Sequence, residues 1–206
     1  MNLTAIVLAG GNSSRLGRNK ANEPILGISL IEHVVDRLRP MADELLIVTS
    51  QEQTDLPELG KTRVLTDAYP GKGPLAGLYT GLSAARYPRS VVVGCDMPFL
   101  NTELLRYMVG LSDDFDAVVP RLGQSKVEPL HAIYAKSCLE IIKTHLEHNH
   151  LETHAMFDKL RVRYVEETDC RRFDSQLLSF LNINNQADLD RAVSLASTAN
   201  KLVSDY

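Results

Sequence analysis

Residues 8–20 read Leu-Ala-Gly-Gly-Asn-Ser-Ser-Arg-Leu-Gly-Arg-Asn-Lys, and this stretch decides the fold of the chain. It follows directly on residues 4–8, a short apolar run in which polar and apolar residues do not alternate. Such a run is typical of a parallel strand that is buried on both faces of a sheet. A glycine-rich loop directly after a buried first strand therefore predicts an α/β protein.

Strands and helices continue to alternate as far as Pro120. Ser29 and Glu32 fit a capping box, apolar residues follow at helical spacing, and Pro40 ends that helix. Further strands are expected at 44–49, 63–66, 90–95 and 116–119, and further helices at 75–86 and 102–111. Alternation of this kind implies right-handed crossovers, so we expect a three-layer α/β/α fold with a mostly parallel sheet.

The pattern is looser in the C-terminal third. We expect an antiparallel strand at 131–135, a helix at 136–149, a strand at 161–165 and a closing helix at 188–196. No Pro-, Gly- or Ser-rich linker, low-complexity tract or repeat marks a boundary. Residues 1–206 are therefore expected to form a single domain.

Composition and charge exclude several classes of protein. Of the 206 residues, 44% are apolar and 23% charged, as in an ordinary globular domain. Twenty-two Lys and Arg against 26 Asp and Glu give a net charge of −4, so we expect no nucleic-acid partner. The apolar runs are far shorter than the roughly 20 residues of a membrane span, so we expect no membrane association.

The cysteines and the N-terminus indicate a cellular compartment. No basic segment precedes a long apolar one at the N-terminus, so we expect no secretion signal. Cys95, Cys138 and Cys170 are an odd number of widely spaced cysteines with no CxxC pair, which suits free thiols in a reducing environment. A cytoplasmic location is expected.

The glycine-rich loop has the chemical groups of a triphosphate cradle. It is not a P-loop, because no Gly-x-x-x-x-Gly-Lys-[Ser/Thr] sequence occurs, and it is not a G-x-G-x-x-G loop, because Gly10 and Gly11 are adjacent. What remains is Gly-Gly-x3-Arg-x-Gly-x2-Lys, in which backbone amides and the cations Arg15, Arg18 and Lys20 can bind phosphate. The alternative is a solvated turn followed by a charged loop.

Five motifs in this chain resemble those of the molybdenum cofactor guanylyltransferase family, whose members are nucleotidyltransferases with a glycosyltransferase-A-like Rossmann fold. They are Leu8-Ala9-Gly10-Gly11 with Ser13, Arg15, Gly17 and Lys20; Gly73-Pro74-Leu75-Ala76-Gly77-Leu78; Cys95-Asp96-Met97-Pro98-Phe99-Leu100; Glu128-Pro129-Leu130-His131-Ala132; and Asn182-Ile183-Asn184. They occur in the family's order and span the chain. The first two favour the guanylyl branch, since cytidylyl relatives usually carry Ala in place of Gly11.

The chain departs from the family pattern at two places. The family commonly has Asp before the loop lysine, where this chain has Asn19, and we expect this change to loosen the positioning of Lys20 and to reduce activity. Asn185 and Gln186 stand where Thr-Pro usually follows the last motif.

The position of Asp96, after the apolar run 91–93, predicts a metal site. Open α/β sheets bind ligands at the carboxyl ends of their strands, and one carboxylate there can bind Mg2+ together with phosphate oxygens and water. Asp96 could instead cap a turn before Pro98.

The resemblance implies roles for the other site residues. Leu8, Ala9, Gly10, Gly11 and Lys20 would bind the nucleotide, as would Asp96, and Asp67 would lie at the guanosine end. Arg15, Lys20 and Asp96 would be the catalytic residues, the two cations neutralising charge on the departing pyrophosphate. Asp67 could also be an ordinary turn residue, and the cations could form surface salt bridges.

Asn182 and Asn184 flank Ile183, so in an extended segment their side chains would point to the same side. The resemblance places this segment near the second substrate, and related enzymes use an asparagine there as a second metal contact. A plain asparagine turn is the third interpretation.

The histidines are weaker candidates for chemistry. His145, His148, His150 and His154 include no HExxH pattern and no cysteine partner, so we expect a solvated helix face. His131 is expected to be a hydrogen-bonded histidine in the core or in a pocket wall. No Ser/His/Asp or Cys/His nucleophile set is visible.

The resemblance implies that the substrate supplies the nucleophile. The terminal phosphate of molybdopterin, free or carrying molybdenum, would attack the α-phosphate of GTP with Mg2+ as cofactor. Implied protein partners are a molybdenum-insertion protein and apo-molybdoenzymes or their chaperones. The alternatives are a cytidylyltransferase of molybdopterin, a sugar-phosphate nucleotidyltransferase, or a non-catalytic nucleotide-binding paralogue.

Overall fold

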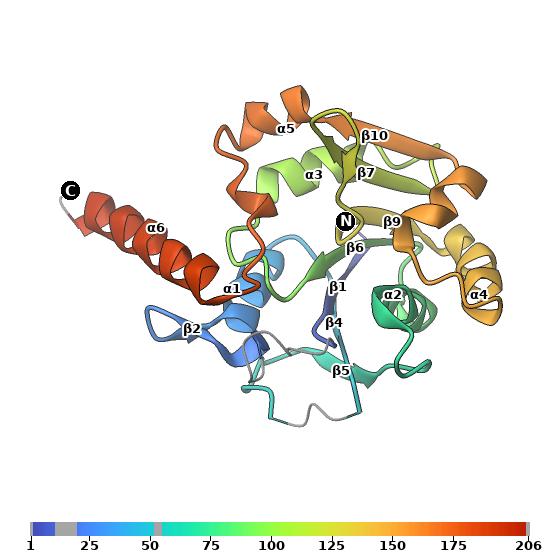
Figure 1. The fold of residues 1–206 in the computed structure, drawn as a ribbon, viewed down its shortest axis with the longest axis horizontal. Coiled ribbons are helices and arrows are strands. Elements are labelled where there is room, and N and C mark those ends of the chain that lie inside the picture. Colours follow the sequence, from blue (N-terminus) through green and yellow to red (C-terminus); the bar gives the residue numbers. More distant parts are fainter. Residues whose placement is uncertain (1, 11–19, 52–54, 205–206) are drawn as a thin grey trace.

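The structure, a computed structural model, describes residues 2–10, 20–51 and 55–204. Its centre is an eight-stranded sheet with the order β10-β7-β9-β6-β1-β4-β5, and β8 pairs with β7 beside this path (Figure 1). The strands are β1 (Leu3–Leu8), β4 (Glu44–Thr49), β5 (Arg63–Thr66), β6 (Arg89–Gly94), β7 (Ala117–Leu122), β8 (Lys126–Val127), β9 (His131–Ala135) and β10 (Val162–Glu166).

The direction of the strands confirms the expected mostly parallel sheet. β1 runs parallel to β4 and β6, β4 to β5, and β10 to β7. β9 is antiparallel to both β6 and β7, as expected for residues 131–135. As a result, the carboxyl ends of β1, β4, β5, β6, β7 and β10 all meet at one edge of the sheet.

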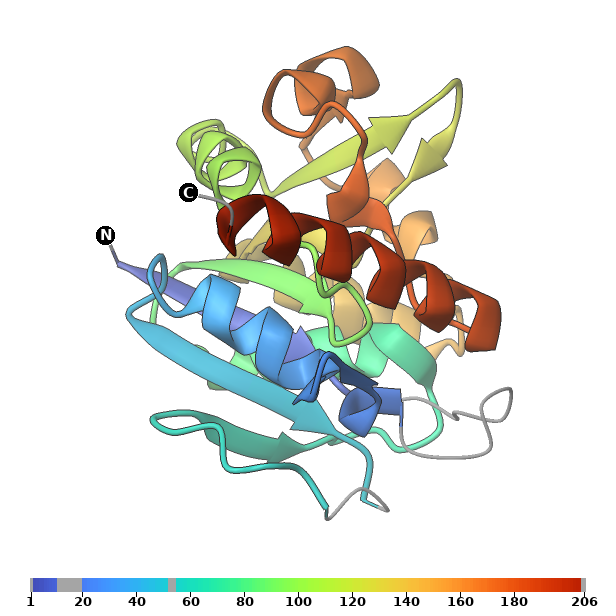
Figure 2. The ribbon, with the colours of Figure 1, turned by 90° about the vertical axis from the view of Figure 1, so that its left-hand side faces the viewer.

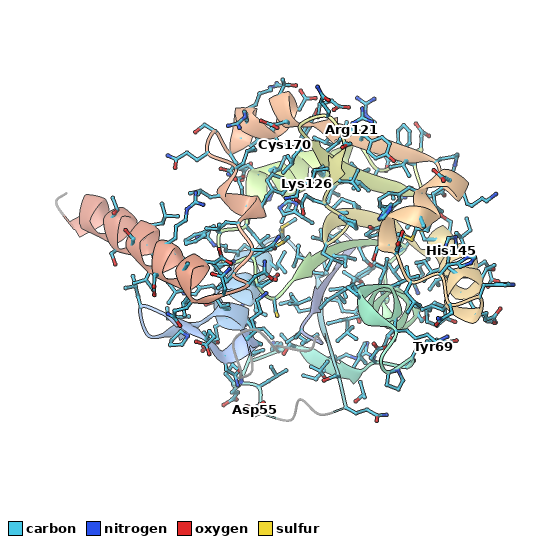
Figure 3. All side chains as sticks on the ribbon, viewed as in Figure 1. Asp55, Tyr69, Arg121, Lys126, His145 and Cys170 are labelled. Carbon is cyan, nitrogen blue, oxygen red and sulfur yellow. The ribbon has the colours of Figure 1, made fainter. Side chains whose placement is uncertain are left out.

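Helices cover both faces, which confirms the three-layer arrangement. They are α1 (Leu30–Leu38), α2 (Gly73–Ala84), α3 (Thr102–Gly110), α4 (Leu139–Glu147), α5 (Glu167–Phe173) and α6 (Gln186–Ser204). Buried side chains of α1, α3 and α5 form one core with the sheet, and those of α2 and α4 form another on its opposite face (Figure 3). Glycine allows α2 to approach β1 closely: a Cβ added at Gly81 would lie 2.5 Å from Ile6 Cγ2.

Local signals in the sequence explain where two helices begin. At α1 the capping box is present, since the Ser29 amide donates to Glu32 Oε2 at 2.9 Å and the Glu32 amide to Ser29 Oγ at 3.4 Å. At α2 the helix begins at Gly73, two residues before its expected start, because Pro74 fits the first helical turn.

Other elements differ from expectation in their bounds or were not expected. The strands expected at 90–95, 116–119 and 161–165 are observed as β6, β7 and β10, shifted by one to three residues at their ends. Residues 136–149 form the short 3-10 helix η2 (Lys136–Cys138) and then α4, which ends before Asn149 in the left-handed region at φ 57°. The closing helix extends from Gln186 to Ser204, and α5 was not expected.

A small third core joins α6 to the rest of the molecule. The hairpin of β2 (Pro24–Ile25) and β3 (Ile28–Ser29) packs against the start of α6, which crosses in front of the sheet in Figure 2. This core consists of Ile25, Leu30, Ile183, Leu189 and Ala192. Within the described ranges, no helix is long and apolar enough to cross a lipid bilayer.

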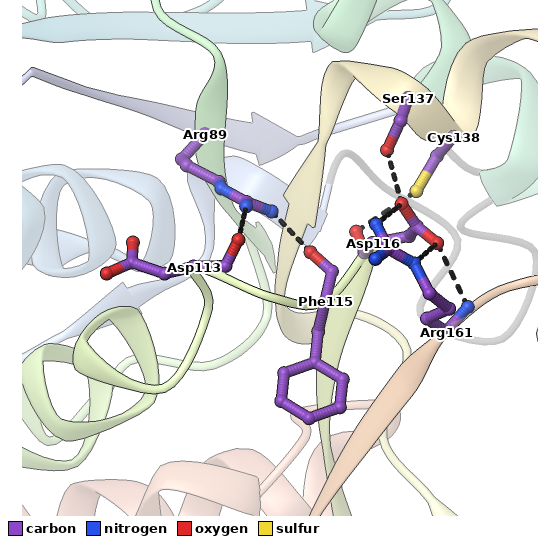
Figure 4. Close-up of polar contacts among 7 residues, drawn as sticks. All are labelled: Arg89, Asp113, Phe115, Asp116, Ser137, Cys138 and Arg161. Carbon is purple, nitrogen blue, oxygen red and sulfur yellow. Dashed lines mark hydrogen bonds and ion pairs between the residues drawn. The ribbon is translucent and has the colours of Figure 1, made fainter.

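A network of polar contacts around Asp116 holds the edge of the sheet farthest from the strand carboxyl ends described above (Figure 4). The Asp116 carboxylate accepts hydrogen bonds from Ser137 Oγ at 2.7 Å and from the Arg161 amide at 3.0 Å. The Arg161 guanidinium adds two contacts of 3.2 Å. The hydrogen bonds from the Arg161 side chain are the main cause that lowers the pKa of Asp116 to about 2.

This lowered pKa predicts that Asp116 stabilises the fold above its ordinary pKa of 3.8 and loses this effect as pH falls toward about 2. We expect Asp116→Asn to lower the free energy of unfolding by about 1–2 kcal/mol near neutral pH, discounted for the exposure of Arg161, and by about half as much near pH 3, which lies between the two pKa values. Urea unfolding at both pH values measures this. Glu103→Gln, which removes an exposed ion pair with Arg106, is the control, and an equal loss at both pH values would contradict the prediction.

Candidate active site

Lys20, Asp96 and Asn184 meet at the carboxyl edge of the sheet. Lys20 lies in the 3-10 helix η1 (Lys20–Asn22), and its Nζ donates to Asp96 Oδ2 at 2.6 Å and to Asn184 Oδ1 at 2.9 Å. The Lys20 and Asp96 side chains are 18% and 22% exposed. Three motifs that are far apart in the sequence therefore contribute to one partly buried polar cluster.

The end of β6 fixes the position of Asp96. The Cys95 amide donates to the Leu8 carbonyl at 3.1 Å, which holds the end of β6 against the end of β1. The Asp96 carbonyl accepts from the Ile183 amide at 3.0 Å. Gly94 leaves room for the carboxylate, because a Cβ added there would lie 2.5 Å from Asp96 Oδ1.

The two asparagines of the last motif lie in different surroundings. Asn184 is exposed and contacts Lys20, and its amide donates to Asp188 Oδ2 at 2.9 Å in the first turn of α6. Asn182 is half-buried, and within the described part of the chain its side chain makes no hydrogen bond. Only Asn184 therefore joins the Lys20 and Asp96 cluster directly.

A narrow cleft lies beside this cluster, over the β1, β4 and β5 half of the sheet. It is lined by Leu8, Gly10, Val48, Thr49, Asp67, Gly73, Pro74 and Gly77. The buried Ala9 supports it from behind, its amide donating to the Val48 carbonyl at 2.8 Å. Of the described residues expected to bind a nucleotide, Leu8, Gly10 and Asp67 therefore line one cleft.

Asp67 is held at the far side of this cleft, after β5. Its amide donates to the Thr49 carbonyl at 2.8 Å, and its Oδ1 accepts from the Tyr69 amide at 3.0 Å and from Thr80 Oγ1 at 3.2 Å. These contacts fix the carboxylate on the wall formed by the start of α2. Gly11 and Arg15 lie outside the described residues.

Burial shifts the pKa values of the three thiols and of one imidazole. Burial raises the pKa of the Cys95 thiol to about 12, as it does for Cys138 and Cys170. Burial also lowers the pKa of His131 to about 4, so its imidazole is neutral. No thiolate is therefore available as a nucleophile, in agreement with the sequence.

The expectation of a hydrogen-bonded His131 is wrong in one respect. The side chain is fully buried, but neither ring nitrogen has a hydrogen-bond partner among the described residues. Its ring packs against that of Phe180, with the centroids 4.6 Å apart. This leaves an unpartnered polar group behind the segment that leads to Asn184.

The four histidines at 145–154 behave mostly as expected. His148, His150 and His154 are exposed around the end of α4 and beyond it, whereas His145 is half-buried. Among the described residues, no group of three or more His, Cys, Asp or Glu side chains could hold a metal ion.

Sequence reasoning missed some residues that shape the site. Gly94, Thr49 and Thr80 were not singled out, although a glycine inside a strand often marks a close approach and so offered a signal at Gly94. Thr49 and Thr80 carried no such signal. Gly73, Pro74 and Gly77 stood in a quoted motif but were not assigned to the site.

Comparison with known proteins identifies relatives along nearly the whole chain. The sequence profile of the MobA-like NTP transferase domain matches residues 5–166. The molybdenum cofactor guanylyltransferase of Desulfosudis oleivorans is 37% identical over 193 residues, covering 92% of this chain and 94% of that protein. A probable molybdenum cofactor guanylyltransferase of Pelotomaculum thermopropionicum is 35% identical, with 95% and 94% covered.

Solved structures agree with these matches. Molybdopterin-guanine dinucleotide biosynthesis protein A from Archaeoglobus fulgidus superposes with a TM-score of 0.83 at 29% identity, over 95% of this chain and 99% of that one. The 2-C-methyl-D-erythritol 4-phosphate cytidylyltransferase from Thermus thermophilus has a TM-score of 0.72 at 19% identity, over 96% and 100%. The second likeness shows a shared Rossmann-like nucleotidyltransferase fold.

The contact between Gly94 and Asp96 generates a prediction. We expect Gly94→Ala to displace the Asp96 carboxylate, because a flexible side-chain end yields more easily than a buried strand. Affinity for a nucleoside triphosphate with Mg2+ should fall about tenfold or more, while the melting temperature changes little. Titration and thermal unfolding measure the two effects. Gly110→Ala, where an added Cβ meets nothing within 4 Å, is the control, and unchanged affinity in Gly94→Ala would contradict the assignment.

Proposed function

We propose a specific reaction for this chain, which belongs to the molybdenum cofactor guanylyltransferase family and carries its MobA-like NTP transferase domain. It transfers GMP from GTP to the terminal phosphate of molybdopterin, free or carrying molybdenum, and releases pyrophosphate. The products are molybdopterin guanine dinucleotide and pyrophosphate. The observation that carries this proposal is the convergence of Lys20, Asp96 and Asn184 beside the cleft that Asp67 lines.

The nucleotide lies in the cleft over β1, β4 and β5. Leu8, Gly10 and Asp67 line this cleft, and a Cβ added at Gly10 would lie 3.0 Å from the Ser50 amide nitrogen, so the backbone there passes close to β4. Ala9 belongs to the same turn. Asp67, held by Thr80, accepts hydrogen bonds at the guanosine end, because carboxylates suit the amino and ring N–H donors of guanine. Gly11 completes this set in the proposal.

The residues present fit a Mg2+ ion. Asp96 Oδ2 and Asn184 Oδ1 both contact the same cation, the Lys20 ammonium, so two oxygen ligands point to one position. Mg2+ prefers one or two carboxylates with phosphate oxygens and water, and such a site needs no larger acidic cluster. Asp96 is the proposed metal ligand and Asn184 a second contact. When bound, Mg2+ supplies positive charge that neutralises phosphate oxygens.

The chain's own residues orient the substrates and neutralise charge. The attacking group is a phosphate oxygen, so no protein nucleophile is needed, and the inert Cys95 thiol agrees with this. Lys20 turns its ammonium group from Asp96 toward the β- and γ-phosphates, and Arg15 adds a second cation as pyrophosphate departs. Positioning and electrostatics supply most of the catalysis in such reactions.

The organisation and location of the protein are part of the proposal. Residues 1–206 act as one nucleotidyltransferase domain, supported by the contact of α6 with β2 and by the shared core that includes Ile183. The protein works in the cytoplasm, supported by three free, buried cysteines. A molybdenum-insertion protein would precede it, and apo-molybdoenzymes or their chaperones would receive the product.

A turnover assay tests the activity. We expect pyrophosphate release from GTP with molybdopterin and Mg2+, and much less with CTP or UTP. Asp96→Asn should reduce turnover about 100-fold or more with the fold intact, because it removes the charged metal ligand. Glu147→Gln, a change on the exposed surface of α4, is the control. Equal or faster turnover with CTP would indicate a cytidylyltransferase. A requirement for a sugar phosphate would indicate a sugar-phosphate nucleotidyltransferase. Nucleotide binding without turnover would indicate a non-catalytic paralogue.

We predict different effects for substitutions at the two asparagines of the last motif. We expect Asn182→Ala to weaken molybdopterin binding more than GTP binding, because Asn182 has no partner in the described residues and lies next to the site. Asn184→Ala should weaken Mg·GTP binding as well, about tenfold, because Asn184 shares the cation position with Asp96. Titrations with each substrate separate the effects. Identical losses for the two variants would contradict these distinct roles.

A further inference from the structure

Glu128 is a nearly buried carboxylate that the proposed mechanism does not use. Its side chain is only 8% exposed, and Lys126 Nζ lies 2.6 Å from its Oε1. Lys126 itself is 67% exposed. Among the described residues, no well-aligned hydrogen-bond donor reaches the buried Oε1. The charge of this buried carboxylate is therefore balanced by an exposed lysine side chain, whose place a ligand with N–H donors can take.

Glu128 lies at the same sheet edge as Asp96. It directly precedes the turn into β9, whose first residue, His131, is opposite Val93 of β6. The Leu130 carbonyl accepts from the Gly94 amide at 3.1 Å, two residues before Asp96. The segment from Glu128 to His131 thus adjoins the strand end that carries the proposed metal ligand.

The sheet order places Glu128 on the opposite side of Asp96 from the nucleotide cleft. The cleft with Asp67 lies over β1, β4 and β5, whereas β9 and β7 continue the sheet beyond β6 in the other direction. A group transferred from the nucleotide at Asp96 must meet its acceptor on this other side. Glu128 therefore lies on the half of the edge that remains for the second substrate.

The surroundings of Glu128 form a wall with polar and aromatic groups. His131 has two unpartnered ring nitrogens and packs on Phe180 at 4.6 Å between centroids. Phe180 leads into the segment whose Ile183 amide donates to the Asp96 carbonyl at 3.0 Å. The segment from Glu128 to His131 thus contacts the end of β6 through the Leu130 carbonyl, and it contacts Phe180 through the His131 ring.

We propose that Glu128 selects the second substrate by accepting hydrogen bonds from the amino group and adjacent ring N–H of a 2-amino-4-oxopteridine. This inference rests on the proposed function, because that function makes a pterin the second substrate. Lys126 is the resting counter-ion of Glu128 and moves aside when the ring binds, as its exposure allows. The two oxygens of a carboxylate match two neighbouring N–H donors in one plane.

A pair of pteridines tests this assignment. Pterin carries a 2-amino group, a donor, whereas lumazine carries a 2-oxo group, an acceptor, on an otherwise similar fluorescent ring. We expect the wild type to bind pterin more tightly than lumazine. Glu128→Gln should weaken pterin binding about 10- to 100-fold and reduce or reverse the preference, because its amide can donate to the 2-oxo group. Fluorescence titration measures each affinity.

The controls separate this proposal from folding effects and from the proposed function. The affinity of Glu128→Gln for GTP should stay within about twofold of the wild type, and its melting temperature within a few degrees. The control Glu147→Gln should bind both pteridines with affinities within about twofold of the wild type. An unchanged pteridine preference, equal loss of GTP and pterin binding, or a wild type that binds neither pteridine would overturn the proposal. If the protein prefers pterin over lumazine but transfers no GMP, only the proposed function is refuted. If it transfers GMP but shows no preference between the two pteridines, only this inference is refuted.

Discussion

The ammonium group of Lys20 joins parts of the chain that are 76 and 164 residues apart. Asp96 comes from the end of β6 and Asn184 from the segment before α6, and the Ile183 amide, which donates to the Asp96 carbonyl, adds a second contact between them. Lys20 also begins η1, so the cluster fixes the position of this short helix relative to the end of β6. The geometry of the site therefore depends on one cation with two oxygen acceptors.

The scaffold around this cluster is built from close backbone approaches. Gly81 brings α2 against Ile6 of β1, and Gly10 passes close to the end of β4. Both contacts lie on the half of the sheet that we propose for the nucleotide, where glycine lets backbone and ligand approach closely. The other half is built differently, with an antiparallel strand, β9, whose turn presents polar side chains. The two halves of the edge thus differ in structure as the two substrates differ in chemistry.

Much of this architecture could be predicted from the sequence. Strands at 44–49, 63–66 and 131–135 have the observed bounds, because each is a short, mostly apolar run that is bounded by turns or loops. The hairpin of β2 and β3 and the helix α5 could not be found in this way. Two-residue strands have no period, and α5 buries only Cys170, so its sequence has no apolar face.

The site was predictable in its motifs but not in its pairings. Asp96 and Lys20 could be singled out from strand-end position and loop composition. That Asn184, and not Asn182, contacts Lys20 depends on how the chain enters α6, where Asp188 holds the Asn184 amide. The lack of partners for His131 likewise follows from packing against Phe180, which no local pattern reveals.

The burial of all three cysteines has a practical consequence. Cys95, Cys138 and Cys170 are buried, and the pKa of each thiol is raised to about 12. Thiol reagents react with thiolates that they can reach, so we expect the native protein to react very slowly with maleimides and iodoacetamides. A single cysteine introduced on the surface would then be labelled selectively in an otherwise natural sequence. Spectroscopic probes can therefore be attached at chosen positions without first removing any native residue.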